Sequence, residues 1–253
     1  MDIAVFGGGG LGRAVAAAVA DRGDTVRIIG RPPSGRHDPA ALVGADAVVE
    51  ASRADAVVGN LRAALDAGCR RAVIATTGWT SDRPIVEALL REHGAAAVAA
   101  SNFSLGVVLF GRLVDAAVGL FGPLASFDPY LVEWHRRTKP DRPSGTAGDL
   151  AERILAGHPG KRRVAGGATR GRPEPEELEV VSIRAGASPG MHLVGFDAPG
   201  ETVELRLTAR DRSAYAAGIL AAADWLVREP RAAGLHPFDP VVDELLAGAP
   251  VVA

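Results

Sequence analysis

The sequence predicts an α/β fold, in which an N-terminal Rossmann-like doubly wound parallel sheet is followed by a central α+β domain with a mixed sheet. Over the first hundred residues, short β-branched runs alternate with Ala- and Leu-rich helical stretches. A glycine-rich turn directly after the first of these runs supports the same fold. After residue 177, three strand candidates follow one another with no helical pattern between them, which is typical of an antiparallel or mixed sheet.

In the N-terminal part, apolar runs and helical patterns alternate regularly. The runs are short and rich in Val, Ile and Ala, as expected for strands that are buried on both faces. We expect strands at 3–6, 25–29, 47–50, 72–75 and 96–100, and helices at 11–21, 54–67 and 84–92. A parallel sheet of this type binds its ligand at the carboxyl ends of its strands.

The alternation ends near residue 104, and the pattern after it predicts a second domain. We expect helices at 105–120 and 146–155, strands at 127–134, 178–184, 191–196 and 202–208, and a long loop at 157–175. Helices at 214–227 and 240–246 follow, and we expect them to pack on the N-terminal part. The predicted domains are 1–104 completed by 212–253, and 105–211.

Charge and composition exclude several classes of function. The chain has 253 residues with 28 Lys and Arg and 30 Asp and Glu, so its net charge of -2 attracts neither nucleic acid nor an anionic membrane. Its start lacks the pattern of a signal peptide and no uncharged stretch reaches bilayer length, so we expect a cytoplasmic protein. Cys69 is the only cysteine, which excludes an intrachain disulfide, and the six histidines lack metal-ligand spacing. We expect no metal site.

A glycine loop indicates a dinucleotide site. The turn after the first predicted strand reads G-G-G-G-L-G from Gly7 to Gly12, which contains the spacing G-x-G-x-x-G and leads into a predicted helix. Glycines here allow a tight turn and a close approach of a pyrophosphate to the backbone, and the helix N-terminus adds partial positive charge. The alternative is a flexible glycine turn without a ligand. The expected cofactor contacts are Gly7, Gly9, Gly10, Leu11 and Gly12.

The end of the second predicted strand favours NADPH over NADH. An NAD site commonly has Asp or Glu at this position, whereas this chain has Gly30 and then Arg31, with Arg36 nearby. A guanidinium can pair with a 2′-phosphate through two hydrogen bonds. The alternative is that both arginines are solvated loop charges and that the protein accepts either cofactor.

The segment 131–146 combines cations, a histidine and a helix start. Lys139 and Arg136 can pair with carboxylates, and the backbone N–H groups of Ser144, Gly145 and Thr146 at the start of the predicted helix favour an anion there. His135 titrates near neutral pH and can donate a proton. The segment therefore fits a small carboxylate-bearing molecule that receives a proton.

The same segment has a plainer interpretation. Thr146 followed three residues later by Asp149 is a capping-box pattern, and a capped helix after a polar loop needs no ligand. A lone histidine in such a loop is usually structural. We expect His192, on a predicted strand, to be structural as well.

Four short motifs occur along the chain in a fixed order. They are T-T-G-W at 76–79, S-N-F-S at 101–104, E-W-H-R-R-T-K-P-D-R-P-S-G-T at 133–146, and R-x-G-x-x-x-G-x-H at 184–192. They resemble T-T-G-F, P-N-F-S, E-x-H-H-x-x-K-x-D-A-P-S-G-T and R-x-G-x-x-x-G-x-H of the dihydrodipicolinate reductases, also called 4-hydroxy-tetrahydrodipicolinate reductases. The resemblance is colinear over essentially the full length, and four ordered motifs are far more specific than one.

The resemblance implies a cytoplasmic homotetrameric oxidoreductase of lysine and diaminopimelate biosynthesis. Such an enzyme reduces dihydrodipicolinate, formed from 4-hydroxy-tetrahydrodipicolinate, to tetrahydrodipicolinate with NAD(P)H. By the resemblance, 1–104 with 212–253 bind the cofactor, and 105–211 bind the substrate and form the oligomer. His135 is then the general acid, Lys139 binds a carboxylate and assists protonation, and Ser144, Gly145 and Thr146 hold a carboxylate. Around the nicotinamide the resemblance places Ser52, Thr77, Gly78, Ser101 and Phe103.

Several departures leave alternatives open. Arg136 replaces the family's second histidine, Arg142 replaces the Ala before Pro-Ser-Gly-Thr, the glycine loop is one residue shorter, and E-A-S at 50–52 replaces D-F-T. Arg136 can still bind a carboxylate with two hydrogen bonds, but it is larger and always charged. The alternatives are a reductase of another cyclic imine carboxylate in a specialised pathway, and a nonenzymatic NADP(H) sensor.

Overall fold

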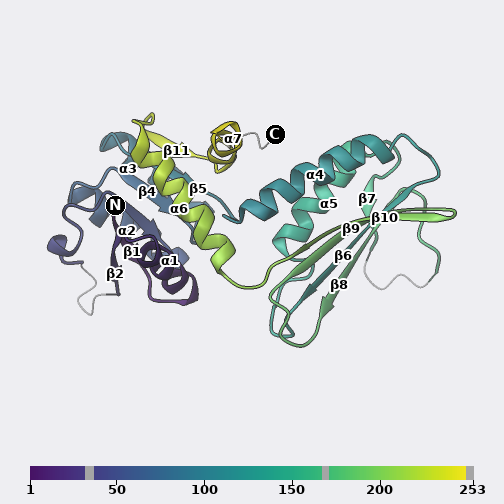
Figure 1. The fold of residues 1–253 in the computed structure, drawn as a ribbon, viewed down its shortest axis with the longest axis horizontal. Helices are drawn as coiled ribbons and strands as arrows, with labels where there is room; N and C mark the ends of the chain where they lie inside the picture. Colours follow the sequence, from purple (N-terminus) through teal and green to yellow (C-terminus); the bar gives the residue numbers. More distant parts are fainter. Residues whose placement is uncertain (32–36, 167–170, 249–253) are drawn as a thin grey trace. The chain divides into compact units, whose positions relative to one another are not determined.

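Two separate cores divide the chain into two units, and each is described by itself. The computed structural model describes residues 1–31, 37–166 and 171–248. The first unit comprises Met1–Leu105 with Arg212–Ala253, and the second comprises Gly106–Asp211 (Figure 1). In the described ranges, no helix is both long enough and apolar enough to cross a membrane.

The short apolar runs of the first unit form one parallel sheet. Its order is β11-β5-β4-β3-β1-β2, and every neighbouring pair among its described strands is parallel. The runs of β1, β3, β4 and β5 are buried almost throughout, which explains why they lack the alternation of a half-exposed strand. The strands are β1 (Asp2–Phe6), β2 (Thr25–Ile29), β3 (Ala47–Glu50), β4 (Arg71–Ile74), β5 (Ala96–Ala99) and β11 (Gly234–His236).

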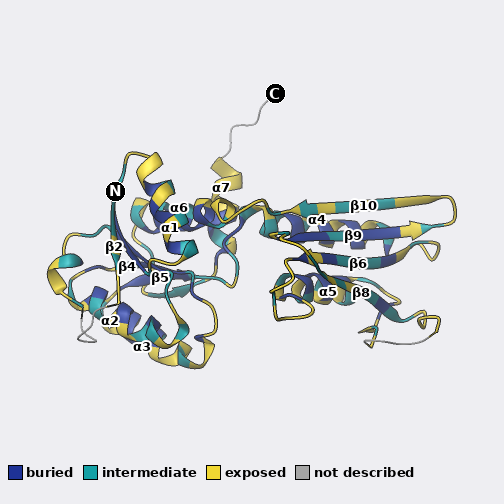
Figure 2. Ribbon diagram, turned by 90° about the horizontal axis from the view of Figure 1, so that it is seen from below, coloured by how far each residue is buried: buried dark blue, intermediate teal, exposed yellow. Residues whose placement is uncertain are grey.

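Helices cover both faces of this sheet, so the predicted doubly wound arrangement is confirmed. The α1 and α6 helices pack together on one face, and α2 and α3 lie on the other (Figure 2). The helices are α1 (Gly10–Asp21), α2 (Val57–Asp66), α3 (Arg83–Glu92), α6 (Ser213–Arg228) and α7 (Asp239–Gly248), with short 3-10 turns at Pro39–Ala41, Ala54–Ala56 and Thr80–Asp82.

The order of the strands changes direction at β1, where a ligand crevice is expected. β2 lies on one side of β1 and β3 on the other. At the carboxyl end of β1, Gly7 has a φ of +102°, and a Cβ on it would lie 2.4 Å from the carbonyl oxygen of Ala51. A Cβ on Gly12 would lie 1.8 Å from the carbonyl oxygen of Gly7. Glycine at both positions lets α1 pack close against the end of β1.

The second unit contains a mixed sheet, as predicted. Its order is β10-β9-β6-β8-β7, with β8 parallel to β6 and to β7, and β9 antiparallel to β6 and to β10. Consecutive strands β8 and β9 do not pair, because β6 lies between them. The elements are α4 (Leu105–Phe121), β6 (Asp128–His135), α5 (Gly145–Gly157), β7 (Arg163–Val164), β8 (Glu177–Arg184), β9 (Met191–Ala198) and β10 (Glu201–Thr208).

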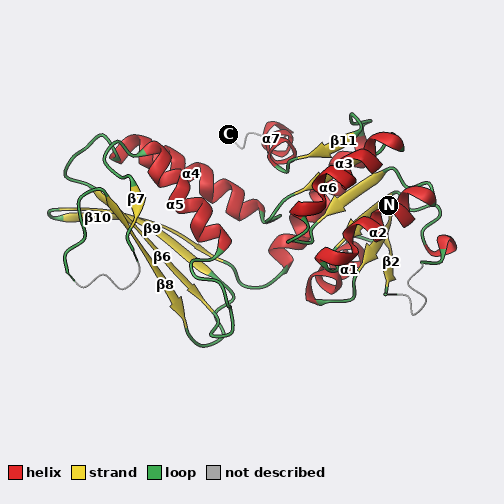
Figure 3. Ribbon diagram, turned by 180° about the vertical axis from the view of Figure 1, so that it is seen from behind, coloured by secondary structure: helices red, strands yellow, loops and turns green. Residues whose placement is uncertain are grey.

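The α4 and α5 helices cover one face of the mixed sheet (Figure 3). Val114 of α4 and Ile154 of α5 pack there with Leu131 and Phe196 of the sheet, and all four side chains are buried. The opposite face exposes large apolar side chains. On that face, Trp134 and Val181 are 38% and 47% exposed.

Three local features differ from the sequence predictions. The predicted loop at 157–175 contains the two-residue strand β7, and β11 was not predicted because three residues carry too little periodicity. The prediction that Thr146 and Asp149 form a capping box is wrong. The α5 helix starts at Gly145, and Ser144 is its cap, because the Ser144 backbone is extended and its Oγ accepts the N–H of Ala147 at 3.2 Å.

Candidate active site

A buried carboxylate joins three elements of the second unit. Glu133 of β6 has 0% exposure, and its Oε1 atom accepts three hydrogen bonds. The donors are the backbone N–H of Ser144 at 3.0 Å, Oγ of Ser182 at 2.5 Å and Nη2 of Arg184 at 2.8 Å. Because Ser144 caps α5 and the other two donors lie on β8, one oxygen atom fixes β6, β8 and the start of α5 to one another.

Strand alternation brings these polar groups together. Along β6, Leu131 faces the core, and Glu133 and His135 follow on the same face toward the carboxyl end. On β8, Ser182 stands opposite Glu133 and Arg184 opposite His135. The inner face of the sheet is thus apolar in its middle and polar at this end.

The hydrogen bonds keep Glu133 ionised. Burial raises the pKa of this carboxyl, but hydrogen bonds from Ser144, Ser182 and Arg184 outweigh it and lower the pKa to about 2. Arg184 supplies the countercharge, with only 3% of its side chain exposed. The site therefore contains a fixed negative charge at neutral pH.

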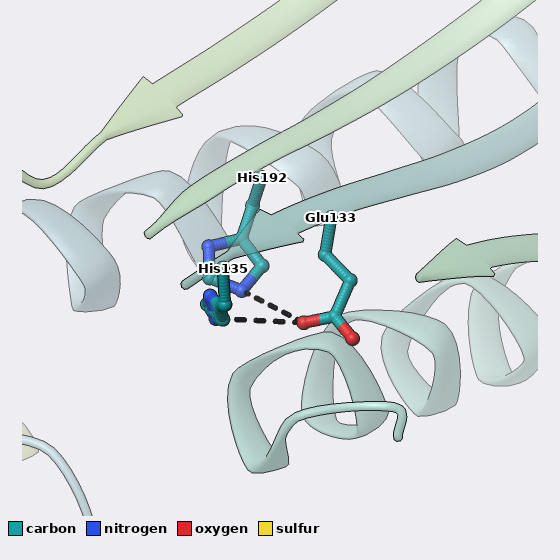
Figure 4. A group of neighbouring side chains, drawn as sticks. All are labelled: Glu133, His135 and His192. Carbon is teal, nitrogen blue, oxygen red and sulfur yellow. Dashed lines mark ion pairs between the residues drawn. The ribbon is translucent and has the colours of Figure 1, made fainter. Parts of the chain in front are cut away.

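The second carboxylate oxygen faces two histidines. Glu133 Oε2 lies 3.5 Å from Nε2 of His135 and 3.9 Å from Nε2 of His192, which comes from β9 (Figure 4). Among the described residues, this buried oxygen accepts no hydrogen bond, and Nδ1 of His135 has no partner either. The two rings are in an edge contact with centroids 5.1 Å apart. His192 Nε2 also lies 3.3 Å from Oγ of Ser144.

Burial makes both imidazoles stronger acids than usual. It lowers the pKa of His192 to about 4, against the opposing effect of Glu133. The pKa of His135 is also lowered, first by burial and then by Arg184 and Lys139, while Glu133 and Asp141 act in the opposite direction. A proton placed on His135 is therefore readily given up.

Two imidazoles and a carboxylate are also a donor set that can hold a metal ion, and their nearest ligand atoms lie within 4.8 Å of one another. The spacing of the histidines in the sequence did not anticipate this cluster. Arg184 already forms an ion pair with the carboxylate, and the positive charge of Lys139 lowers the pKa of both histidines. Because these cations oppose a further positive charge, we interpret the cluster as one that handles protons.

The anion-binding groups predicted from the sequence lie around the same strand end. Ser144 is buried, and Gly145 and Thr146 form the first turn of α5. The Lys139 ammonium forms an ion pair with Asp141 at 2.8 Å, so a substrate carboxylate would share or replace this partner. Arg136 is exposed, on the turn that follows β6.

A separate cavity of about 910 Å³ lies at the carboxyl ends of β1, β2 and β3 in the first unit. Of the cofactor residues predicted from sequence, it is lined by Gly7, Gly9, Arg31 and Ser52. Arg53 and Arg62 also line it, and sequence reasoning had assigned them no role. Arg36 lies outside the described residues.

A second buried glutamate, Glu50, is hydrogen-bonded to residues that line this cavity. Oε1 of Glu50 accepts hydrogen bonds from the backbone N–H of Ser52 at 2.9 Å and from Oγ1 of Thr76 at 3.0 Å, and also from the Ser52 hydroxyl. Oε2 accepts from Nδ2 of Asn60 at 2.7 Å, and Asn60 Oδ1 lies 2.7 Å from Nε2 of His37. The Ser52 hydroxyl is thus directed at Glu50.

The remaining predicted cofactor residues lie around the ends of neighbouring elements. Thr77, Gly78 and Ser101 are exposed after β4 and β5. Phe103 is 2% exposed and packs on Phe238 with ring centroids 4.9 Å apart, so a ligand could reach only its backbone. Gly10, Leu11 and Gly12 form the first turn of α1.

Arg212 is a neighbour of the glycine loop that the sequence did not suggest. Its guanidinium lies so close to Gly10 that a Cβ there would meet Nη1 at 1.4 Å. A cation beside a helix N-terminus strengthens the attraction for a phosphate.

Comparisons with known proteins decide the family. The family model for the C-terminus of dihydrodipicolinate reductase matches residues 106–239. The chain is 36% identical over 193 residues to the 4-hydroxy-tetrahydrodipicolinate reductase of Wolinella succinogenes, covering 74% of this chain and 73% of the relative. The corresponding reductase of Methanoculleus marisnigri is 36% identical over 192 residues, covering 76% and 74%. This chain belongs to the dihydrodipicolinate reductase family.

Solved structures of the family and of related dehydrogenases share this fold. A dipicolinate-bound dihydrodipicolinate reductase from Paenisporosarcina sp. TG-14 matches with a TM-score of 0.70 at 18% identity, covering 94% of this chain and 97% of that one. An engineered D-amino acid dehydrogenase bound to NADP+ matches with a TM-score of 0.53 at 18% identity, covering 99% of each chain. At such identities the likeness shows the fold alone.

Sequence reasoning missed three residues of the polar cluster at the carboxyl end of β6. Glu133 and Arg184 stood inside the quoted motifs without a role, and His192 was expected to be structural. The spacing of Glu133 was a usable signal, because residues two apart on a strand point to the same face, and Glu133 is two residues before His135. His192 and Arg184 carried no such signal, since their strands meet β6 only in the tertiary structure.

The lowered pKa of Glu133 predicts a pH-dependent contribution to stability. Since its ordinary pKa is about 4.5, the ionised side chain stabilises the folded state above that pH, and this contribution is lost as the pH falls toward 2. We expect Glu133→Gln to lower the free energy of unfolding by on the order of 3 kcal/mol at pH 6, and by progressively less below pH about 5. Urea unfolding across this pH range measures both values.

The matched control for this comparison is Glu201→Gln, at an exposed position of the same sheet, which should change the unfolding free energy by less than about 0.5 kcal/mol. A deficit for Glu133→Gln that stayed constant from pH 6 to pH 3 would contradict the assignment of a strongly stabilised carboxylate.

Proposed function

We propose that this protein is a 4-hydroxy-tetrahydrodipicolinate reductase, which reduces dihydrodipicolinate to tetrahydrodipicolinate in lysine and diaminopimelate biosynthesis. The observation that carries the proposal is the placement of His135 beside the start of α5, where a proton donor and an anion-binding helix end lie together. Membership of the family supports the same reaction.

His135 supplies the proton of this reaction. When bound, NADPH supplies a hydride to the conjugated imine ring, which is left as an enamine-like anion that needs a proton. Each turnover consumes one dihydrodipicolinate, one NADPH and one proton, and yields tetrahydrodipicolinate and NADP+. Burial lowers the pKa of His135, so its protonated form is a stronger acid than a solvated imidazolium.

The start of α5 and Lys139 hold the substrate carboxylates. The N–H groups of the first helical turn, at Gly145 and Thr146, favour a negative group, and Lys139 adds a full positive charge on the adjacent turn. A reductase of the same fold has been solved with dipicolinate bound, which supports a small dicarboxylate as the substrate class.

The cavity of the first unit fits the dinucleotide. Gly7 and Gly12 are positions where a Cβ would collide with backbone, and Gly7, Gly9 and Ser52 line the cavity. Arg31, Arg53 and Arg62 line it together with Asp55 and Asp66, and an arginine can pair with a 2′-phosphate through two hydrogen bonds. We therefore propose NADPH as the preferred cofactor, with NADH as a possible substitute.

One observation favours a second candidate substrate. Arg136, in place of the family's second histidine, is exposed on the turn that also carries Lys139. An arginine at this position would hold a carboxylate with two hydrogen bonds and take up more room than a histidine. The second candidate function is therefore the reduction of another cyclic imine carboxylate by the same chemistry.

The outer face of the mixed sheet supports a homotetramer. Val181 and Ile183 are 47% and 41% exposed, and they stand beside Val132 and Trp134 of β6. A sheet that leaves such a face in water needs a partner surface, and a second copy of this chain offers the same apolar face.

For the catalytic assignment, the change is His135→Gln. We expect kcat with the product of dihydrodipicolinate synthase to fall by about 10²- to 10⁴-fold, because the general acid is lost, while the Kd for NADPH is unchanged. NADPH oxidation at 340 nm and a fluorescence titration with NADPH give the two values. His93→Gln, in the first unit, is the control. A wild-type protein that binds NADPH but oxidises none with this substrate would reject the substrate assignment.

For the cofactor preference, the change is Arg31→Ser. Removing one charge-assisted contact should raise KM for NADPH by about tenfold and leave KM for NADH nearly the same. Steady-state kinetics with both cofactors measure the effect, and Arg91→Ser on the exposed side of α3 is the control. A wild-type preference for NADH, or equal changes for both cofactors, would contradict the role of Arg31.

For the oligomer, the change is Val181→Glu combined with Ile183→Glu. Charges on the outer face of the sheet should dissociate the tetramer, and light scattering should give a smaller mass for a protein that keeps its circular dichroism spectrum. Ile85→Glu, at an exposed position of α3, is the control and should leave the mass unchanged. A wild-type monomer would refute the proposed assembly.

A further inference from the structure

The carboxylate of Glu133 is satisfied on one oxygen only. Oε1 accepts three hydrogen bonds, whereas Oε2, which is equally buried, accepts none among the described residues. A buried charged acceptor without a donor is costly, so a group that faces it is expected to donate. The groups in place are Nε2 of His135 at 3.5 Å and Nε2 of His192 at 3.9 Å (Figure 4).

An ionised carboxylate can only accept, so it selects which nitrogen of a facing imidazole carries hydrogen. A lone pair on Nε2 of His135 would point at negative charge, while an N–H there is attracted to it. In the neutral ring the lone pair is then on Nδ1, and any proton that the ring takes up is added at Nδ1. Hydrogen bonds of this kind are often long before the substrate is bound.

Gly190 lies beside the buried edge of the His135 ring that includes Nδ1. A Cβ on Gly190 would lie 3.4 Å from Nδ1 and 3.2 Å from Cε1 of His135, so a side chain there would cover the ring edge. Nδ1 itself has no hydrogen-bond partner in the described structure. The nitrogen that Glu133 leaves available for a proton is thus buried beside a glycine, and no described side chain is hydrogen-bonded to it.

We propose that Glu133 is the positioning residue of the proton donor, and that its Oε2 atom fixes a hydrogen on Nε2 of His135 so that Nδ1 gives the proton to the substrate. In the transfer, the Nδ1–H bond breaks and a C–H bond forms on the reduced ring. The imidazole is left neutral with its hydrogen on Nε2, and solvent restores the proton on Nδ1. This inference rests on the proposed function for its substrate but not for the state of His135.

The charges around His135 set the direction of the effect. Glu133 from β6 and Asp141 raise its pKa, while Arg184 from β8 and Lys139 lower it, and His192 from β9 packs against its ring. Without the charge of Glu133, burial, Arg184 and Lys139 still lower the pKa of His135, and only Asp141 still raises it. The pH above which kcat falls should then move to lower pH.

The direct test is the hydrogen position on His135 in the protein itself. Long-range 15N–1H spectra of 15N-histidine-labelled wild-type protein distinguish the two neutral tautomers without any substrate. We expect hydrogen on Nε2 at pH 8, and an assignment of the hydrogen to Nδ1 would overturn the proposal. His135→Gln assigns the signal.

Three variants add independent readouts. In Glu133→Gln the amide oxygen stays with the donors at Oε1, so the NH₂ faces Nε2 and should move the hydrogen of neutral His135 to Nδ1. Its kcat should fall by about tenfold or more, with the basic limb of the pH profile at lower pH. Glu133→Asp keeps a charged acceptor and should retain hydrogen on Nε2. Ser182→Ala removes a donor from Oε1 alone, and should lower stability without changing the tautomer.

The outcomes separate this inference from the proposed function. Hydrogen on Nε2 in the wild type and on Nδ1 in Glu133→Gln supports the positioning role, even if the protein reduces a different imine. If Glu133→Gln does not fold, the wild-type, Glu133→Asp and Ser182→Ala spectra still decide. An unchanged tautomer and pH profile in a folded Glu133→Gln protein would overturn the proposal, whatever the substrate is.

Discussion

The structure of the second unit depends on one buried charge, the carboxylate of Glu133. Its Oε1 atom binds the backbone of Ser144, the hydroxyl of Ser182 and the guanidinium of Arg184, so β6, β8 and the start of α5 meet at this atom. A charge without exposure is tolerated only when donors replace the lost water, and three donors do so here. The same donors hold the end of β6 in place, and His135 is the last residue of that strand.

The cap of α5 shows how this constraint reaches the start of the helix. In a capping box, a Glu or Gln three residues into the helix accepts the N–H of the cap residue. The residue at that position here is Ala147, and Glu133 from a distant strand accepts the Ser144 N–H instead. The start of α5 and His135 therefore both lie against one carboxylate.

The first unit uses a related arrangement. Glu50, at the carboxyl end of β3, receives hydrogen bonds from Ser52, Thr76 and Asn60, and it stands where the family pattern has Asp. Its carboxylate is hydrogen-bonded within the protein, and the residues that line the cavity include Arg31, Arg53 and Arg62 as well as Asp55 and Asp66. In both units a buried glutamate near a strand end organises the neighbouring loops.

The sequence by itself determined the parallel and mixed sheets, the glycine loop and the family motif around His135, because these depend on periodicity, on glycine spacing and on residues adjacent in the chain. It could not determine that Ser144 rather than Thr146 caps α5, since the choice depends on a hydrogen bond that Glu133, on another element, accepts from the Ser144 N–H. Nor could it determine that His192 joins His135, because β9 pairs with β6 across more than fifty intervening residues. The partners of a buried charge come from whichever strands lie side by side, and only the tertiary structure decides that.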